Sequence, residues 1–360
     1  MRTSALKRLA GAALTACLAA GALLAGQAAT AQAEELRTFR FASTDPRGGD
    51  PQQLYWYLPL AKGWYEEAGI DFQPVRMPPS TAYPALSAGQ IEGGIYAGSA
   101  PLAGARGAPM VAVYHPEESA PWGLLVNTNK IDVPEGLNGA RCGSAAGPKT
   151  APDITARTVI KHMGADPTSM IYVVVPGSST EYLTAMRNGV IDCHPSYTPP
   201  MRYILEREGW TFVAGMRDVL PIQGMGLTVN RNRIADEAEH RELVKDVIRQ
   251  MLRAQDYIRD PANHAEIAEI LKASMNNPEE LTDEDYLRAL KDEVTLYTEG
   301  GKVADPDDLL NLMRAGISFG YYDPSEFVVD LEKTGAIEAG MVDYSLVDEV
   351  HAETGRNKTQ

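Results

Sequence analysis

The chain has 360 residues and a formal net charge of −15, with 44% hydrophobic and 22% charged residues. This acidic balance excludes nucleic acid and anionic membrane surfaces as expected partners, because both repel a negatively charged protein. The length is sufficient for two lobes of ordinary domain size, each with its own hydrophobic core.

The first 33 residues have the pattern of a secretory signal peptide. A basic leader, MRTSALKR, precedes the apolar run LAGAALTACLAAGALLAG, and the small residues AQA stand before Glu34. This order predicts export with cleavage after Ala33. The alternative is a lipoprotein signal with lipidation at Cys17, although the apolar run continues beyond Cys17, where a lipoprotein would turn polar. No later stretch approaches the roughly 20 apolar residues that a membrane-spanning helix needs.

From Leu36 to about Leu227, short β-branched or aromatic runs alternate with helical stretches, which is typical of a largely parallel α/β architecture. The polar turn IDVPEGLNG divides this region into two series of similar element order, which indicates twin lobes. In the first series we expect strands at 37–44, 70–77, 93–98 and 109–115 and helices at 51–68 and 83–90. In the second we expect strands at 139–144, 170–177, 190–197 and 210–216 and helices at 150–164, 179–189 and 199–209.

The remainder of the chain is expected to be almost entirely helical after one more strand at 221–231. Its segments have an amphipathic period and are separated by polar breaks. The expected helices lie at 241–260, 264–275, 282–297 and 305–320.

Several stretches resemble one known family. They include LPLAKGWYEEAGIDFQPV (58–75), ALSAGQIEGGIYAGSAPLAGARGAPMVAVY (85–114), LNGARCGSAAG (137–147), the region 164–200 and the closing VDYSLVDEV (342–350). Together they are similar to the nitrate/sulfonate/taurine-type periplasmic solute-binding proteins of ABC importers, which share a fold with thiamine-pyrimidine precursor synthases. The similarity covers most of the chain after the signal peptide, in the same order.

The resemblance implies a type II periplasmic-binding-protein fold, in which each lobe is a doubly wound, mostly parallel α/β sheet. We expect a first lobe of residues 34–128 and 222–360, with the C-terminal helices packed on it, and a second lobe of residues 129–221. The chain would cross between the lobes near 127–131 and near 219–224. Ligand would bind at the carboxyl ends of the strands, and binding would favour closure of the lobes.

Candidate ligand residues of the first lobe follow expected strands. In YAGSAP, Gly98 and Ser99 stand between a strand and a helix, where backbone N–H groups and the helix dipole hold an anion without a cationic side chain. Arg47 is a candidate partner for a carboxylate or sulfonate, Trp56 for stacking, and Thr81 for a polar contact. The alternatives are a solvated loop for Arg47, a core position for Trp56 and helix capping for Thr81.

Candidates of the second lobe occupy equivalent loops. Lys149 and Thr150 stand at a helix start, where a cation opposes the helix dipole, and this favours a ligand role for Lys149. In PGSSTEYL the S-x-x-E spacing indicates a capping box, which leaves Ser179 and Thr180 able to donate to a ligand. The remaining candidates are Ser196 and Tyr197, which follow the next strand, and Trp122 and Gln223, which lie at the crossings and are otherwise hinge or core residues.

Two cysteines remain after signal cleavage, Cys142 and Cys193. If the second lobe has the strand order 2-1-3, their strands are parallel neighbours about 4.8 Å apart, and matching register would permit a disulfide; two buried thiols are the alternative. His194 adjoins Cys193, but neighbouring residues of a strand point to opposite faces and no second ligand pair is visible. We therefore expect neither a metal nor a cofactor.

Together with the resemblance, these features predict an extracytoplasmic, periplasmic receptor that captures a small organic anion and delivers it to an inner-membrane ABC permease, and we expect it to be a monomer. Arg47 and Lys149 favour an anion, and the aromatic candidates favour a flat or apolar body. No G-x-S-x-G, P-loop, dinucleotide-binding or H-E-x-x-H motif indicates an enzyme. The alternatives are a receptor for a pyrimidine or other heterocyclic thiamine or flavin precursor, a sensory receptor, or a residual enzyme of the pyrimidine-synthase type.

Overall fold

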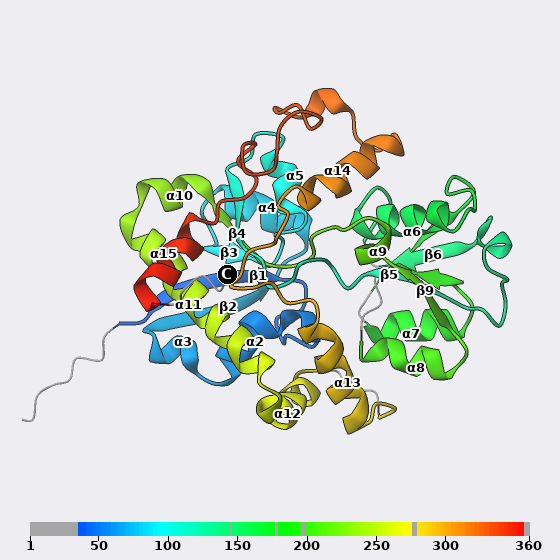
Figure 1. Cartoon of the computed structure of the whole chain (residues 1–360), viewed down its shortest axis with the longest axis horizontal. Coiled ribbons are helices and arrows are strands. Elements are labelled where there is room, and N and C mark those ends of the chain that lie inside the picture. Colours follow the sequence, from blue (N-terminus) through cyan, green and yellow to red (C-terminus); the bar gives the residue numbers. More distant parts are fainter. Residues whose placement is uncertain (1–34, 145, 177–178, 196–198, 276–278, 356–360) are drawn as a thin grey trace, which may run out of the picture. The chain divides into compact units, whose positions relative to one another are not determined.

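The computed structural model describes residues 35–355 except 145, 177–178, 196–198 and 276–278, and it contains two five-stranded mixed sheets surrounded by helices (Figure 1). The expected signal peptide, including Cys17, lies outside the described residues. Among the described residues, no helix combines the length and apolar character that crossing a membrane requires.

The first sheet has the strand order β2-β1-β3-β10-β4. Its strands β1 (Arg37–Ser43), β2 (Ile70–Arg76), β3 (Gly93–Gly94) and β4 (Met110–Tyr114) run parallel, and β10 (Leu227–Asn230) is antiparallel to both of its neighbours. Aromatic side chains fill the core on this sheet: Phe39 stacks on Phe72 at 5.6 Å between ring centroids, and Tyr65 stacks on Phe72 at 4.1 Å. These contacts explain why alternate positions of the first two strands are aromatic.

The second sheet repeats this arrangement with the order β7-β6-β8-β5-β9. It is composed of β5 (Gly123–Val126), β6 (Arg141–Ser144), β7 (Ile171–Val174), β8 (Cys193–His194) and β9 (Thr211–Gly215), with β5 antiparallel to β8 and β9. Because β5 pairs in this sheet, the chain first crosses between Tyr114 and Gly123, which corrects the crossing expected near 127–131. The second crossing lies between Gly215 and Leu227 and includes the expected 219–224.

Each expected helical segment contains a helix, and the helices Ala100–Gly104, Met216–Val219, Arg231–Asp236 and Ser345–Thr354 lie outside the expected ranges. Two of the expected helices differ locally. Gly63 adopts a φ of 70° and divides the helix expected at 51–68, and the helix expected from residue 83 begins at Pro79, because proline is favoured in a first turn. The helices are α2 (Leu54–Ala61), α3 (Trp64–Glu67), α4 (Pro79–Ser87), α5 (Ala100–Gly104), α6 (Ala151–His162), α7 (Ser179–Arg187), α8 (Met201–Arg207), α9 (Met216–Val219), α10 (Arg231–Asp236), α11 (Ala238–Arg259), α12 (His264–Ser274), α13 (Asp283–Val294), α14 (Asp308–Ser318) and α15 (Ser345–Thr354), with short 3-10 helices at Pro51–Gln53 (η1), Glu135–Leu137 (η2), Pro261–Asn263 (η3) and Pro324–Glu326 (η4).

The C-terminal helices pack on both lobes rather than on the first lobe alone. Helices α11 and α15 bury apolar residues in the core of the first sheet, as expected. Helices α12 and α13, however, share a hydrophobic cluster with α7 and α8 of the second lobe, and α14 packs against α6. Polar contacts accompany this packing, since the Tyr203 hydroxyl donates to Asp292 Oδ2 at 2.6 Å and Arg207 pairs with Asp285 at 2.8 Å.

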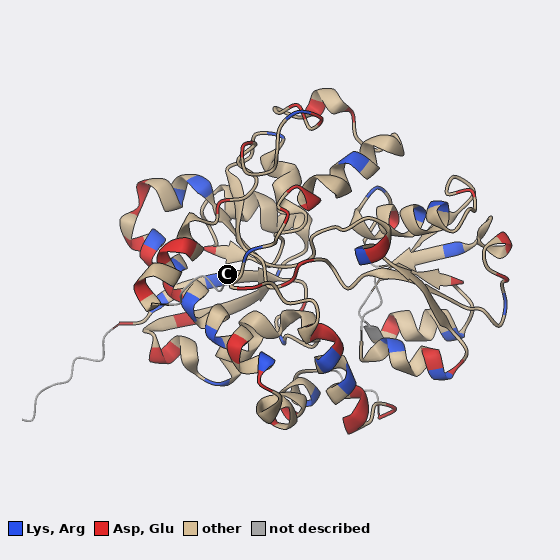
Figure 2. Cartoon of the chain, viewed as in Figure 1, with Lys and Arg blue, Asp and Glu red and all other residues tan. Residues whose placement is uncertain are grey.

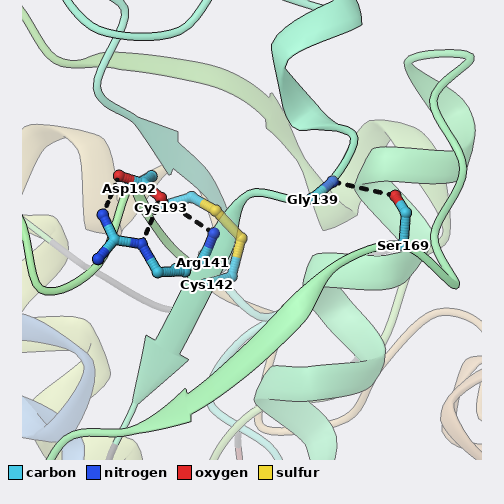
Figure 3. Close-up of a disulfide and its surroundings, with 6 residues drawn as sticks. All are labelled: Gly139, Arg141, Cys142, Ser169, Asp192 and Cys193. Atoms are coloured by element: carbon cyan, nitrogen blue, oxygen red, sulfur yellow. Dashed lines mark hydrogen bonds and ion pairs between the residues drawn. A yellow bond between two sulfur atoms is a disulfide. The ribbon is translucent and has the colours of Figure 1, made fainter.

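A disulfide joins the two neighbouring strands β6 and β8 of the second lobe (Figure 3). Cys142 and Cys193 are register partners in the parallel pair, and their Cα atoms lie 4.5 Å apart. Both side chains are fully buried, and the adjacent Arg141 and Asp192 form an ion pair at 2.9 Å between the same two strands. The strand order and register that would permit a disulfide are thus present, and of the two alternatives the structure has the disulfide rather than two buried thiols.

Removal of this disulfide is expected to lower the free energy of unfolding by about 2–4 kcal/mol, because the bridge restricts the unfolded chain. The measurement is chemical unfolding of the chain starting at Glu34, with and without reductant. A Cys142→Ser/Cys193→Ser double variant is the control and should not respond to reductant. Two reactive thiols in the unfolded, unreduced chain would contradict the pairing.

Candidate ligand site

The candidate residues of the first lobe lie where its parallel strands end and lead into helices. In a doubly wound α/β sheet this edge is where ligands bind, because strand-to-helix loops converge there. Ser99 follows β3 and precedes α5, while Thr81 lies in the first turn of α4, which follows β2. The crossing strand β10 starts at the same edge, so Gln223 lies just ahead of it in the chain.

Gly98, Ser99 and the second crossing are in direct contact. The Gly98 N–H donates to Gly224 O at 2.8 Å, and a Cβ atom at Gly98 would lie 2.2 Å from Gln223 O, so only glycine fits this approach. Gln223 is 2% exposed; its Nε2 donates to Glu118 O at 2.8 Å, and its Oε1 has no partner within the described residues. The structure therefore assembles these predicted residues where the second crossing enters the first sheet.

A tyrosine that the sequence analysis did not select accompanies Ser99. The Tyr83 hydroxyl lies 2.6 Å from Ser99 Oγ, and its ring makes an edge contact with Tyr96 at 5.6 Å. Burial is the main cause that raises the pKa of Tyr83 to about 12, so its hydroxyl keeps its proton at neutral pH and acts as a donor. Because α5 has five residues, its dipole is small, and the polar character of this edge comes mainly from hydroxyl and backbone N–H groups.

Lys149 in the second lobe has an unusual backbone conformation. Its φ of 65° is the one positive value among the non-glycine residues that the structure describes. Its N–H donates to Asp153 Oδ2 at 2.8 Å and its carbonyl accepts from the Tyr322 hydroxyl at 3.0 Å, which holds the strained conformation. The Lys149 ammonium lies 5.9 Å from the Tyr321 ring centroid and forms no ion pair with any described residue.

Thr150 is the N-cap residue of α6, but its hydroxyl donates to Gly147 O at 2.5 Å and does not cap that helix.

The segment after α14 links the two groups of candidates. Tyr322 binds the Lys149 carbonyl, and its hydroxyl is close enough to Tyr83 to contribute to the raised pKa of that side chain. Tyr322 therefore contacts Lys149 directly and lies in the neighbourhood of Tyr83, the partner of Ser99. The only sequence signal for Tyr322 is its place in YYD after a helix, and nothing local to that stretch indicates a contact with residues 149 or 83.

Three first-lobe candidates lie in less favourable surroundings. Arg47 is exposed and pairs with Asp45 at 3.0 Å. Burial acts to raise the pKa of Asp45, but hydrogen bonds from Arg47 offset it and the pKa falls below its ordinary value. Trp56 is fully buried between Phe41 and Phe72 in the first core, with its Nε1 atom unpartnered among the described residues. Thr81 is exposed, and its hydroxyl donates to Pro78 O at 3.1 Å.

Trp122 lines a separate cavity of about 230 Å³ beside the first crossing. The cavity wall combines the aromatic Phe212 with charged side chains from the second lobe and from α13. The charged lining residues are Arg202, Arg217, Asp218, Asp292 and Glu293.

The remaining candidates are less fully described. Thr180 is exposed in the first turn of α7, and the side chain of Ser179 lies outside the described residues, as do Ser196 and Tyr197. His194 is buried, and burial lowers its pKa to about 3. Within the described residues, no group of three His, Cys, Asp or Glu side chains has an arrangement that could hold a metal ion.

Comparison with solved structures establishes the fold. A protein from Bordetella bronchiseptica RB50 aligns with a TM-score of 0.67 at 17% identity, over 89% of this chain and 99% of its own. The putative periplasmic sulfonate-binding protein SsuA from Methylobacillus flagellatus KT gives 0.60 at 15% identity, over 90% and 96%. The periplasmic nitrate-binding protein NrtA from Synechocystis PCC 6803 gives 0.65 at 14% identity, over 89% of each chain. The chain thus has the two-lobed fold of periplasmic binding proteins.

A search of curated proteins by sequence finds no match. A family model does match, and it spans residues 50–264, which include both crossings and the strand-end loops described above. The chain belongs to the NMT1/THI5 like family.

Proposed function

We propose that this protein is an extracytoplasmic solute-binding receptor of an ABC importer that captures a small organic anion, such as a sulfonate, taurine or a carboxylate. The observation that carries the proposal is the Lys149 ammonium, which has no ion pair with the described residues and extends from a strained loop whose carbonyl accepts from Tyr322, a neighbour of Tyr83. The Lys149 side chain is exposed to solvent, and strained backbone of this kind is concentrated at ligand-binding and active sites. The sulfonate- and nitrate-binding neighbours of the same fold support this assignment.

Each element of the site has a separate task in this proposal. Lys149 supplies the positive charge, and the hydroxyls of Ser99 and Tyr83 donate to the oxygens of the anion. Gln223 lies beside Gly98 and offers its Oε1 atom, which has no partner within the described residues, to a donor on the ligand. Because these residues come from both lobes, ligand stabilises the closed arrangement by the difference between its affinities for the closed and open states.

The partner in this scheme is a permease in the inner membrane that accepts ligand from the closed receptor, and the receptor acts as a periplasmic monomer without catalysing a reaction. The disulfide between Cys142 and Cys193 supports an oxidising compartment, because buried structural disulfides persist in exported proteins. The chain carries out binding and release, and the importer supplies the energy.

A heterocyclic ligand is the second candidate, and the tyrosines favour it. Tyr83, Tyr96 and Tyr322 lie around the Ser99 edge and offer flat faces as well as hydroxyls. A pyrimidine precursor would stack on the faces of the tyrosine rings, whereas a sulfonate would bind the tyrosine hydroxyls and the Lys149 ammonium.

Thermal unfolding against a panel of sulfonates, carboxylates, nitrate and pyrimidines is expected to identify an anion as the ligand. An anion at 100 times its Kd should add about 2.7 kcal/mol to the stability of the protein. Lys149→Ala should abolish the rise in the unfolding midpoint, while Lys161→Ala, at an exposed lysine of α6, should keep it. If uncharged heterocycles alone raise the midpoint, the anion assignment is wrong.

Tyr322→Phe is expected to weaken binding of the ligand found in that panel about fivefold. The substitution removes only the hydroxyl that holds the Lys149 carbonyl, so the ammonium loses its fixed position, and one hydrogen bond of this kind contributes about 1 kcal/mol. Isothermal titration calorimetry measures the effect, with Tyr257→Phe, whose hydroxyl contacts Glu266, as the control. Equal affinities in Tyr322→Phe and the parent would show that Tyr322 does not position Lys149.

A further inference from the structure

Two glutamates are buried at the junction between the first crossing and α13. Glu117 lies in the crossing and is 1% exposed, and Glu293 lies in the last turn of α13 and is 4% exposed. Backbone hydrogen bonds hold the two segments together: Glu118 N–H donates to Leu296 O at 2.7 Å, and Thr298 N–H donates to Pro116 O at 2.8 Å. These backbone hydrogen bonds therefore keep both carboxyl groups buried between the two segments.

The polar partners of this pair do not compensate two negative charges. Gln52 Nε2 donates to Glu117 Oε2 at 3.0 Å, but Oε1 of Glu117 and Oε1 of Glu293 have no donor within the described residues. The two carboxyl groups are within reach of a hydrogen bond to each other. Two ionised carboxylates have no proton to donate, so this contact requires that one of them is protonated.

The surrounding ionisable groups add negative rather than positive charge. The groups that act on the pair are Asp50, before η1, and Asp292, the neighbour of Glu293 on α13. The hydroxyls of Tyr55 and Tyr297 are buried nearby and stay neutral, because burial raises the pKa of each well above its ordinary value. The nearest cations are otherwise engaged or exposed: Arg259 donates to Tyr297 O and Thr298 O, Arg202 pairs with Glu206 at 2.9 Å, and Arg217 is exposed across the cavity beside Asp218.

Burial is the main reason that the pKa of each glutamate lies above its ordinary value, and the neighbouring carboxyl raises that of Glu117 further. A bound metal ion is the other way to compensate two carboxylates. The described residues provide no third His, Cys, Asp or Glu ligand in a suitable arrangement. A single proton, in contrast, requires only one oxygen from each carboxyl group, and both are present.

We propose that Glu117 and Glu293 hold one proton between them and that this shared proton fastens α13 to the first crossing. The proton is bonded to one carboxyl oxygen and hydrogen-bonded by the other; when the pH rises, it passes to solvent and leaves two carboxylates that repel each other. Asp292, next to Glu293, accepts from Tyr203 of the second lobe. Loss of the proton therefore loosens the connection between α13 and both the crossing and the second lobe. The proposal does not depend on the identity of the ligand.

The test is the pH dependence of unfolding for the ligand-free protein. Because the folded-state pKa values are raised, the stabilisation is present at pH 5 and is lost as the pH rises through them, so the folding equilibrium constant should fall up to tenfold per pH unit in that range. Glu293→Gln keeps the shape of the side chain and should remove this fall, and Glu117→Gln should do the same. Glu284→Gln, an exposed position of the same helix, should follow the parent profile.

Two direct measurements on the parent protein apply even if a variant fails to fold. Carboxyl ¹³C NMR of glutamate-labelled protein should show a resonance that titrates well above the ordinary glutamate range, and amide hydrogen exchange in α13, corrected for its intrinsic pH dependence, should accelerate on the same titration. Parallel pH profiles of the parent and Glu293→Gln, or glutamate resonances that all titrate in the ordinary range, would overturn the proposal. A change of the unfolding midpoint on adding EDTA or replacing sodium with potassium would overturn it in favour of a bound cation.

Discussion

Each sheet of this protein includes a strand that the chain supplies after crossing from the other lobe, and the rest of the structure depends on this exchange. Strand β10 enters the first sheet between β3 and β4, and β5 enters the second between β8 and β9, each antiparallel to its neighbours. An inserted strand cannot slide without breaking hydrogen bonds on both sides. The two crossings are thus fixed at both ends, and any relative motion of the lobes must occur in the short segments between the sheets.

This constraint also explains the chemistry of the candidate site. Because β10 lies beside β3, the second crossing passes within van der Waals distance of Gly98, and Ser99 is presented at the edge where the crossing begins. In the second lobe the same edge carries Lys149, whose strained backbone is held by Asp153 and Tyr322. Figure 2 shows acidic and basic residues interspersed along the C-terminal helices, and many are paired there, whereas Lys149 has no ion pair with the described residues.

The sequence predicted the architecture well because its signals are local. Alternating strands and helices, the twin series and the strand order that joins Cys142 to Cys193 all follow from short-range patterns and from the rules of α/β winding. The strand GLLV at 123–126 was not placed in the second sheet, because a short apolar run does not indicate which sheet it pairs with. Figure 1 shows how that strand lies in the second lobe, beyond the crossing.

The candidate site was predicted in part, for a similar reason. Gly98, Ser99, Lys149 and Thr150 could be placed in loops after strands because such loops can be located from the strand pattern, and their contact with a ligand stays a prediction. The same pattern did not separate Trp56, which is fully buried in the core, from an aromatic that lines a pocket. Tyr83 and Tyr322 were missed because their roles come from partners 16 and 173 residues away in the chain.

The C-terminal helices change how lobe closure must be understood. Helices α13 and α14 contact both lobes, so closure cannot be a rotation about the two crossings alone. Either these helices move with the second lobe and slide on the first, or their polar contacts exchange partners as the lobes move. The polar contacts of α13 with the second lobe are a hydrogen bond and partly exposed ion pairs, which contribute little individually and can exchange at small cost. Apolar residues of α13 also share a hydrophobic cluster with α7 and α8 of that lobe. Its contact with the crossing is a buried carboxyl pair, for which separation would expose two acids and release a proton. Separating α13 from the first crossing therefore costs more than exchanging its polar contacts with the second lobe. This difference favours α13 as a fixed extension of the first lobe, and the second lobe then moves over the surface of α13.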